Sequence, residues 1–179
     1  MKELIILLLL FFIFACSTKE SESVESGTEL DYPDQESWNT VLTITNQGNK
    51  MGVVVASHLK KYSSKNLTLI SDGLKVDFYN AQGRHTSVLT SEGGRVHDVK
   101  QDMIAYGNVV VVSDSGMTLY TDTLRWDNER QKIISEIPVT IISETDTLYG
   151  DSFISDPGLE NYEITNSRGT GSNLLRKKS

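Results

Sequence analysis

The stretch TLYTDTLRWD at residues 118–127 recurs twenty-nine residues later as TLYGDSFISD at residues 147–156. Both copies place Thr, Leu, Tyr and Asp at equivalent positions, and residues 87–92 form a looser third copy. Each unit reads as an apolar strand, a turn, and a second strand that begins with TLYxD. A strand pair of this kind cannot bury its apolar face alone, so neighbouring copies must bury theirs together. The repeat therefore predicts a stacked antiparallel sheet that is folded over on itself, either a solenoid-like sheet or a β jelly roll.

The rest of the chain has the same texture between residues 38 and 166. Leu74, Val76 and Phe78 alternate with polar or amphipathic neighbours, which is the period of a half-buried strand. Turn-forming clusters of Gly, Asn, Asp and Pro interrupt the apolar runs, at residues 46–49, 80–83, 93–94, 127–130 and 156–158. No apolar stripe of helical period is longer than two turns. We expect an all-β domain of about a dozen short antiparallel strands.

The repeat and the alternation assign one face of each strand to the interior. The offset of the repeat places Val110 and Val112 on Val139 and Ile141. These side chains either fill a core or line an apolar groove between two separated faces, and the sequence leaves both readings open. The residues predicted to face inward are Val76, Phe78, Val88, Ile104, Val110, Val112, Leu119, Leu124, Trp126, Val139, Ile141, Leu148 and Phe153.

The N-terminal segment predicts export and attachment to a membrane. Residues 4–14 are uninterruptedly apolar and too short to span a bilayer, and the single cysteine, Cys16, follows the small Ala15. We interpret residues 1–15 as a lipoprotein signal peptide and Cys16 as the lipidation site; a retained N-terminal anchor is the alternative. Residues 16–37 are rich in Ser, Glu and Asp, which is typical of a flexible tether. Residues 38–166 form the β domain and residues 167–179 a short basic tail.

Charge and motifs exclude several classes of function. The net charge of −7 argues against nucleic-acid binding, which needs a basic face. His58, His85 and His97 lack metal-ligand spacing, and no nucleophile elbow, P-loop or dinucleotide-binding glycine pattern occurs. The recurring aspartates lack a calcium-loop pattern and are expected to form turns at strand ends. We expect a protein that is not an enzyme and that needs no metal or cofactor.

The segments assembled so far resemble the LptC family, the periplasmic component C of the lipopolysaccharide export system, within the OstA-like superfamily. The resemblance runs through LKVDFYNAQG (74–83), SVLTSEGG (87–94), MIAYGNV (103–109), LYTDTLRWD (119–127), IISEIPV (133–139) and YGDSF (149–153). It implies a twisted, open, V-shaped β jelly roll that takes lipopolysaccharide from an inner-membrane ABC transporter and passes it to a soluble jelly-roll carrier. The acyl chains would lie against the inward residues. The transporter would meet the N-terminal edge near residues 38–46, and the carrier would meet the C-terminal edge near residues 162–165.

One departure from the family and several alternatives follow from the same residues. Many members carry an N-terminal transmembrane helix, whereas this chain is expected to hold the periplasmic side of the inner membrane by acyl chains on Cys16. Ser17 would favour the outer membrane by the enteric sorting habit. The alternative function is a lipid-anchored structural or protein-binding β module with no lipid cargo. A soluble shuttle or the N-terminal domain of the outer-membrane translocon is a third possibility. A continuous apolar groove would favour transfer, and a close-packed core would favour the module.

Overall fold

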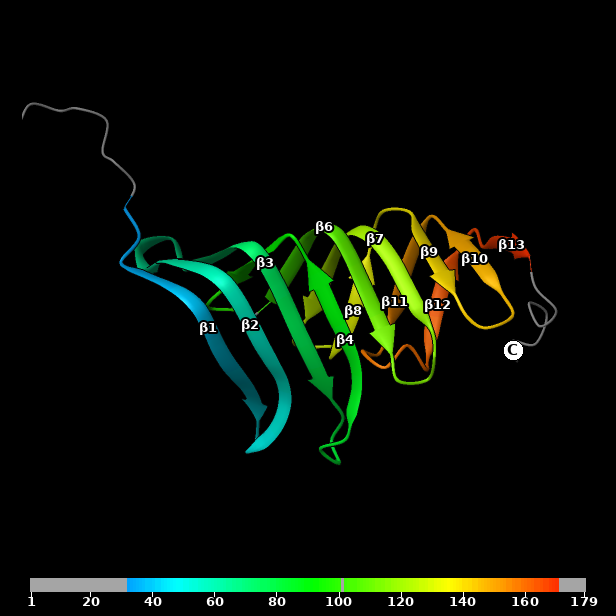
Figure 1. Cartoon of the computed structure of the whole chain (residues 1–179), viewed down its shortest axis with the longest axis horizontal. Helices are drawn as coiled ribbons and strands as arrows, with labels where there is room; N and C mark the ends of the chain where they lie inside the picture. The colour runs from blue at the N-terminus through cyan, green and yellow to red at the C-terminus, as the bar shows by residue number, and fades with distance from the viewer. Residues whose placement is uncertain (1–31, 101, 171–179) are drawn as a thin grey trace, which may run out of the picture. The chain divides into compact units, whose positions relative to one another are not determined.

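The computed structural model describes residues 32–100 and 102–170, and within these ranges thirteen β-strands form one antiparallel sheet (Figure 1). This confirms the predicted all-β jelly-roll class. A 3-10 turn, η2 (Ser63–Lys65), joins β2 to β3. The predicted signal peptide, Cys16, most of the tether and the end of the tail lie outside the described residues. The strands are β1 (Gln35–Asn46), β2 (Asn49–Tyr62), β3 (Leu67–Tyr79), β4 (His85–Ser91), β5 (Gly93–His97), β6 (Asp102–Ser113), β7 (Thr118–Asp127), β8 (Lys132–Ser135), β9 (Val139–Ile142), β10 (Thr147–Gly150), β11 (Ser152–Ser155), β12 (Tyr162–Thr165) and β13 (Arg168–Thr170).

The sheet folds into two layers because β3, β6 and β7 each change partners along their length. The first part of β3 pairs with β5 and its second part with β4. β6 pairs first with β5 and then with β4, and β7 pairs with β9 at its start and with β8 at its end. We name the layer that contains β4, β9, β10 and β13 the β4 layer, and the layer that contains β5, β8, β11 and β12 the β5 layer. β3, β6 and β7 contribute to both layers. The apolar core lies between the two layers.

The bend between the layers is built from backbone that departs from strand geometry. Gly107 has φ +75° and Asn108 has φ +47°, and the β6–β7 register shifts at this point. Glu92, which separates β4 from β5, accepts a backbone bond from Gly73 at 2.9 Å and donates one to Gly107 at 2.9 Å. The side-chain amide of Asn108 donates to the carboxylate of Glu92. Glycine is required at Gly107 because a left-handed φ strains residues that carry a Cβ atom.

The repeat is real, but its two hairpins differ in length by one residue. In the β9–β10 hairpin, four residues separate the paired Ile142 and Thr147. In the β6–β7 hairpin, five residues separate the paired Val112 and Thr118, and Gly116 in this turn has φ +89°. The offset of twenty-nine residues that aligns β10 with β7 therefore shifts β9 by one residue relative to β6. By structure Ile142 corresponds to Val112, whereas the offset matches it with Ser113.

This length difference corrects three of the predicted inward residues. Val112 is 48% exposed, whereas its neighbour Val111 is 0% exposed. The prediction of an inward side chain is wrong for Val112, and it is also wrong for Val110 and Val88, because a slip of one residue moves each side chain to the other face of a sheet. Val88 pairs with Val112 and so shares its face, while Leu89 is buried in its place.

The recurring aspartates organise the turns at the tips of the β5 layer. Asp127 accepts a bond from the backbone N–H of Arg130 at 2.9 Å and one from the side chain of Arg125 at 3.1 Å. The Arg130 N–H is the main reason that the pKa of Asp127 lies below its ordinary value. Asp156, its counterpart in the repeat, accepts the backbone N–H groups of Glu160 and Asn161. Both aspartates are therefore turn-forming residues.

The corrected phase predicts different responses from two adjacent valines. Val111→Ala removes methyl groups from a fully buried site and is expected to lower the free energy of unfolding by roughly 2 kcal/mol. Val112→Ala is expected to change it by less than about 0.5 kcal/mol, because the side chain already faces solvent. Urea unfolding of the two variants measures both values. Equal destabilisation would show that β6 has been assigned the wrong face.

Candidate functional site

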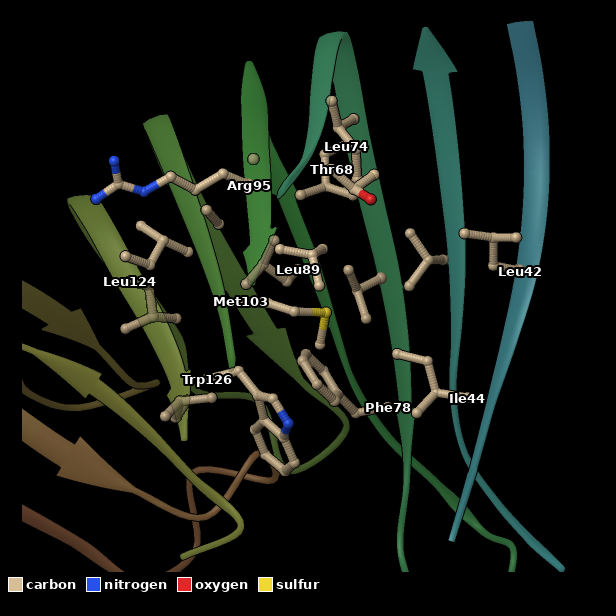
Figure 2. Close-up of a pocket in the computed structure, with 18 of the residues that line it drawn as sticks. Leu42, Ile44, Thr68, Leu74, Phe78, Leu89, Arg95, Met103, Leu124 and Trp126 are labelled. Atoms are coloured by element: carbon tan, nitrogen blue, oxygen red, sulfur yellow. The ribbon is translucent and has the colours of Figure 1, made fainter. Parts of the chain in front are cut away.

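An apolar cavity of about 180 Å³ lies between the two layers in the N-terminal half of the domain (Figure 2). Its wall combines side chains from β1 to β8, which are almost all aliphatic or aromatic. The residues that line it are Leu42, Ile44, Val54, Leu59, Thr68, Ile70, Leu74, Val76, Phe78, Leu89, Gly94, Arg95, Val96, Met103, Ile104, Ala105, Leu124, Trp126 and Ile133.

The few polar groups of the wall do not make the interior polar. The hydroxyl of Thr68 donates to Asp98 at 3.0 Å and is thereby satisfied. Arg95 lies at the rim, and its guanidinium extends away from the apolar lining (Figure 2). Cavities with purely apolar walls exclude water and accept apolar ligands of matching size. The lining therefore has the chemistry that suits a hydrocarbon group, and the exposed Arg95 adds a cation at its rim.

The cavity reaches the N-terminal edge of the sheet. Leu42 and Ile44 belong to β1, which pairs with β2 and with no other described strand. Leu42 is 43% exposed although it contributes to the wall, and Trp38 and Val41 on the same strand are more exposed. An apolar ligand that enters at this edge would cover the exposed part of Leu42.

Towards the other end of the domain the interior is packed. Leu119 and Leu159 are 0% exposed and Phe153 is 2% exposed. The ring of Phe153 stacks on Tyr162, with 6.1 Å between centroids. Phe78 and Trp126 belong to the cavity wall, with ring centroids 5.9 Å apart. By contrast, Leu119, Phe153 and Leu159 do not line the cavity, so the cavity and this packed region occupy different parts of the interior.

The thirteen residues predicted to line a groove fall into three groups. Five line the cavity: Val76, Phe78, Ile104, Leu124 and Trp126. Five belong to the packed C-terminal half: Leu119, Val139, Ile141, Leu148 and Phe153. Three lie on the outer face: Val88, Val110 and Val112.

Sequence reasoning missed most of the wall that β1, β2 and the first part of β3 contribute. Val54 and Ala56 are buried with period 2, but the β2–β3 register shifts between Ala56 and His58. Ile70 and Leu74 are both buried and share the phase of Val76 and Phe78, and only Asp72, which has a positive φ, is exposed in that phase. On β2 the signal was an alternation that changes phase after Ala56, and on β3 it was the phase of Val76 and Phe78 continued back to Ile70.

Histidine 58 braces the N-terminal edge strand. Its Nε2 atom lies 2.7 Å from the Glu36 carboxylate, and its ring stacks on Trp38 with 5.0 Å between centroids. The hydrogen bond with His58 is the main reason that the pKa of Glu36 is lowered. Two residues of β1 thus attach to one side chain of β2, which orders the free edge.

The described part of the chain offers no cluster of three His, Cys, Asp or Glu side chains that could hold a metal. Among residues 32–100 and 102–170, no helix has the length and apolar character needed to cross a bilayer. His85 lies between two carboxylates, Asp114 at 2.9 Å and Asp77 at 3.5 Å, and His97 accepts the backbone N–H of Lys100 at 3.4 Å.

The fold is an open β jelly roll. Its antiparallel sheet bends into two layers with an apolar cavity between them, and its end strands each pair with one neighbour only. The model of the family described as "Lipopolysaccharide-assembly, LptC-related" matches residues 4–151, and the protein belongs to this family. The fold is similar to that of LptH from Pseudomonas aeruginosa, described as the LptA-homologous periplasmic component of the conserved lipopolysaccharide transport device. The two share 11% sequence identity at a TM-score of 0.50, over 72% of this chain and 87% of LptH. No curated protein matches the sequence.

Filling the cavity should abolish binding of apolar probes. Ala105 lines the cavity and is 6% exposed, so Ala105→Phe is expected to place a ring in the space that a ligand would occupy. Fluorescence titration with 1-anilinonaphthalene-8-sulfonate should show weaker binding to the variant than to the wild type. Val112→Ala, on the outer face, serves as the control. Unchanged binding by a folded Ala105→Phe protein would show that the probe binds elsewhere.

Proposed function

We propose that this protein is a membrane-anchored periplasmic lipid-transfer protein. It takes lipopolysaccharide from an inner-membrane ABC transporter and passes it to the next jelly-roll carrier of a bridge across the envelope. The observation that carries the proposal is the apolar cavity that reaches the N-terminal edge of an LptC-family jelly roll. Membership of a family of transport proteins supports the expectation that the protein is not an enzyme.

The chemistry of the cavity supports acyl chains as its ligand. Hydrocarbon chains need an apolar wall without unpaired polar groups, and the lining meets this requirement. Arg95 at the rim presents a guanidinium, which binds phosphate well. A lipid whose acyl chains occupy the cavity and whose phosphorylated headgroup remains near Arg95 fits both features.

The free edges of the sheet support docking on both sides by strand addition. An unpaired strand presents backbone N–H and C=O groups that serve as a template for another strand. Among the described strands, β1 pairs with β2 alone, β12 with β11 alone and β13 with β10 alone. In the proposed bridge, β1 meets the transporter, and β12 with β13 meets the soluble carrier. β1 and β12 coincide with the edges that the sequence indicated.

The anchor of the proposed bridge is Cys16 with its acyl chains, on the periplasmic side of the inner membrane. Residues 16–31 separate this cysteine from the first described residue. A flexible segment of this length reaches roughly 20 Å from the bilayer. That distance is sufficient for the domain to stand at the exit of a transporter. Mass spectrometry of the mature N-terminus tests this part of the proposal directly.

Photo-crosslinking tests the lipid path. A photoreactive residue at Leu124, inside the cavity, is expected to capture lipopolysaccharide in cells with a working exporter. The same residue at Val112, on the outer face, should not, because that side chain is separated from the cavity by the sheet. Adducts are detected by immunoblotting against lipopolysaccharide. Absence of an adduct at Leu124, or equal adducts at both positions, would contradict lipid transfer through the cavity.

Crosslinking at the edges tests the two partners separately. A photoreactive residue at Thr43 on β1 is expected to capture a membrane protein of the transporter, and one at Glu163 on β12 a soluble carrier. Both side chains are exposed on edge strands. Thr90 is equally exposed but lies on β4, inside the sheet, and is the matched control. The same partner captured at Thr43 and Glu163 would contradict an ordered bridge.

A further inference from the structure

The connection between β11 and β12 reaches across the gap between the two layers. We name residues 156–161 of this connection the strap. The buried hydroxyl of Ser87, on β4, donates to the carbonyl of Pro157 at 2.6 Å. The buried hydroxyl of Ser113, on β6, donates to the carbonyl of Gly158 at 2.6 Å. The strap therefore begins in the β5 layer and is attached to the β4 layer.

The strap is organised by its own residues. The backbone N–H of Leu159 donates to the carbonyl of Asp156 at 3.1 Å. The carboxylate of Asp156 accepts the N–H of Glu160 at 3.0 Å and that of Asn161 at 3.1 Å, and the hydroxyl of Ser155 donates to the carbonyl of Asn161 at 3.2 Å. These bonds do not involve the β4 layer, so the strap can leave that layer without losing its internal structure.

Leu159 is the side chain that the strap inserts into the interior. It is 0% exposed and belongs to the apolar core, although its backbone has φ +58°. A left-handed conformation is unfavourable for leucine and persists only where the surrounding contacts compensate for it. The contacts that Leu159 makes in the core are therefore what keeps it in this conformation.

The strap is attached where the cavity ends. Phe78, Ser87 and Ser113 are successive cross-strand partners on one inward face. Phe78 lines the cavity, whereas the two serines bind the strap. Beyond them the interior is filled by Leu159, Leu119 and Phe153.

We propose that the strap is a latch that separates the cavity from the C-terminal half of the interior, and that Ser87 and Ser113 hold it closed. This inference rests on the proposed lipid-transfer function. In the closed state acyl chains occupy the cavity next to β1. In the open state Leu159 withdraws, and the chains can move between the layers towards β12 and β13.

A disulfide across the latch tests the inference. A Cβ atom built on Gly158 would lie 3.6 Å from the Cβ of Thr86, which is within the range of disulfides. The full-length Thr86→Cys/Gly158→Cys protein is expected to hold the strap closed when oxidised and to release it when reduced. Photoreactive residues at Leu124, in the cavity, and at Leu148, in the C-terminal half, report where lipopolysaccharide is bound.

The expected result is an adduct at Leu124 in both redox states and loss of the Leu148 adduct in the oxidised protein only. Ser87→Ala/Ser113→Ala, which removes both anchoring hydroxyls, should increase the Leu148 adduct. Thr86→Cys alone and Gly158→Cys alone, each of which still contains Cys16, control for other disulfides. Equal Leu148 adducts in the oxidised and reduced proteins, or none in either state, would overturn the latch while leaving the transfer function standing. Absence of adducts at Leu124 would overturn the transfer function and, with it, the latch.

Discussion

The structure depends on one constraint: its long strands must bend so that each can pair in two layers. Two backbone hydrogen bonds of Glu92, one with Gly73 and one with Gly107, stabilise this bend, and each is 2.9 Å long. A straight strand at either position would keep its neighbours in a single layer, and the inward side chains would then have no opposite face to pack against. The bend creates the interior, and the backbone freedom of glycine makes the bend possible.

The two ends of the resulting interior differ: one contains an apolar cavity, and the other is lined by closely buried side chains. An apolar cavity lies in the half of the domain that contains β1, and its wall includes the small Ala105 and the flexible Met103 of β6. Towards β12 the space is filled by Phe153 and by Leu159, which the strap inserts. A lipid carrier with these two regions would receive its ligand at one end and need a conformational change to release it at the other.

Much of the fold could be predicted from the sequence, because period-2 alternation and turn residues are local signals. The repeat correctly indicated stacked hairpins and turn-forming aspartates. The same repeat placed Val110 and Val112 on the wrong face, since five residues separate the paired positions of the β6–β7 hairpin and four those of the β9–β10 hairpin. Val88, which pairs with Val112, was placed on the same wrong face. The four successive valines of β6 carry no alternation that could have revealed the shift. Apolar residues on both faces of a strand leave its phase to be set by its partners.

By itself, the sequence determined an antiparallel β fold, its stacking, and an interior of aliphatic and aromatic side chains, all of which follow from short-range patterns. Only the tertiary structure decided which of these side chains surround a cavity and which are packed. Leu124 and Phe153 occupy equivalent positions of the repeat and are equally buried, yet Leu124 lines the cavity and Phe153 does not. Contacts distant in the sequence meet in the interior, among them those that attach the strap to Ser87 and Ser113. Packing depends on which elements meet across the layers, and no local pattern carries that information.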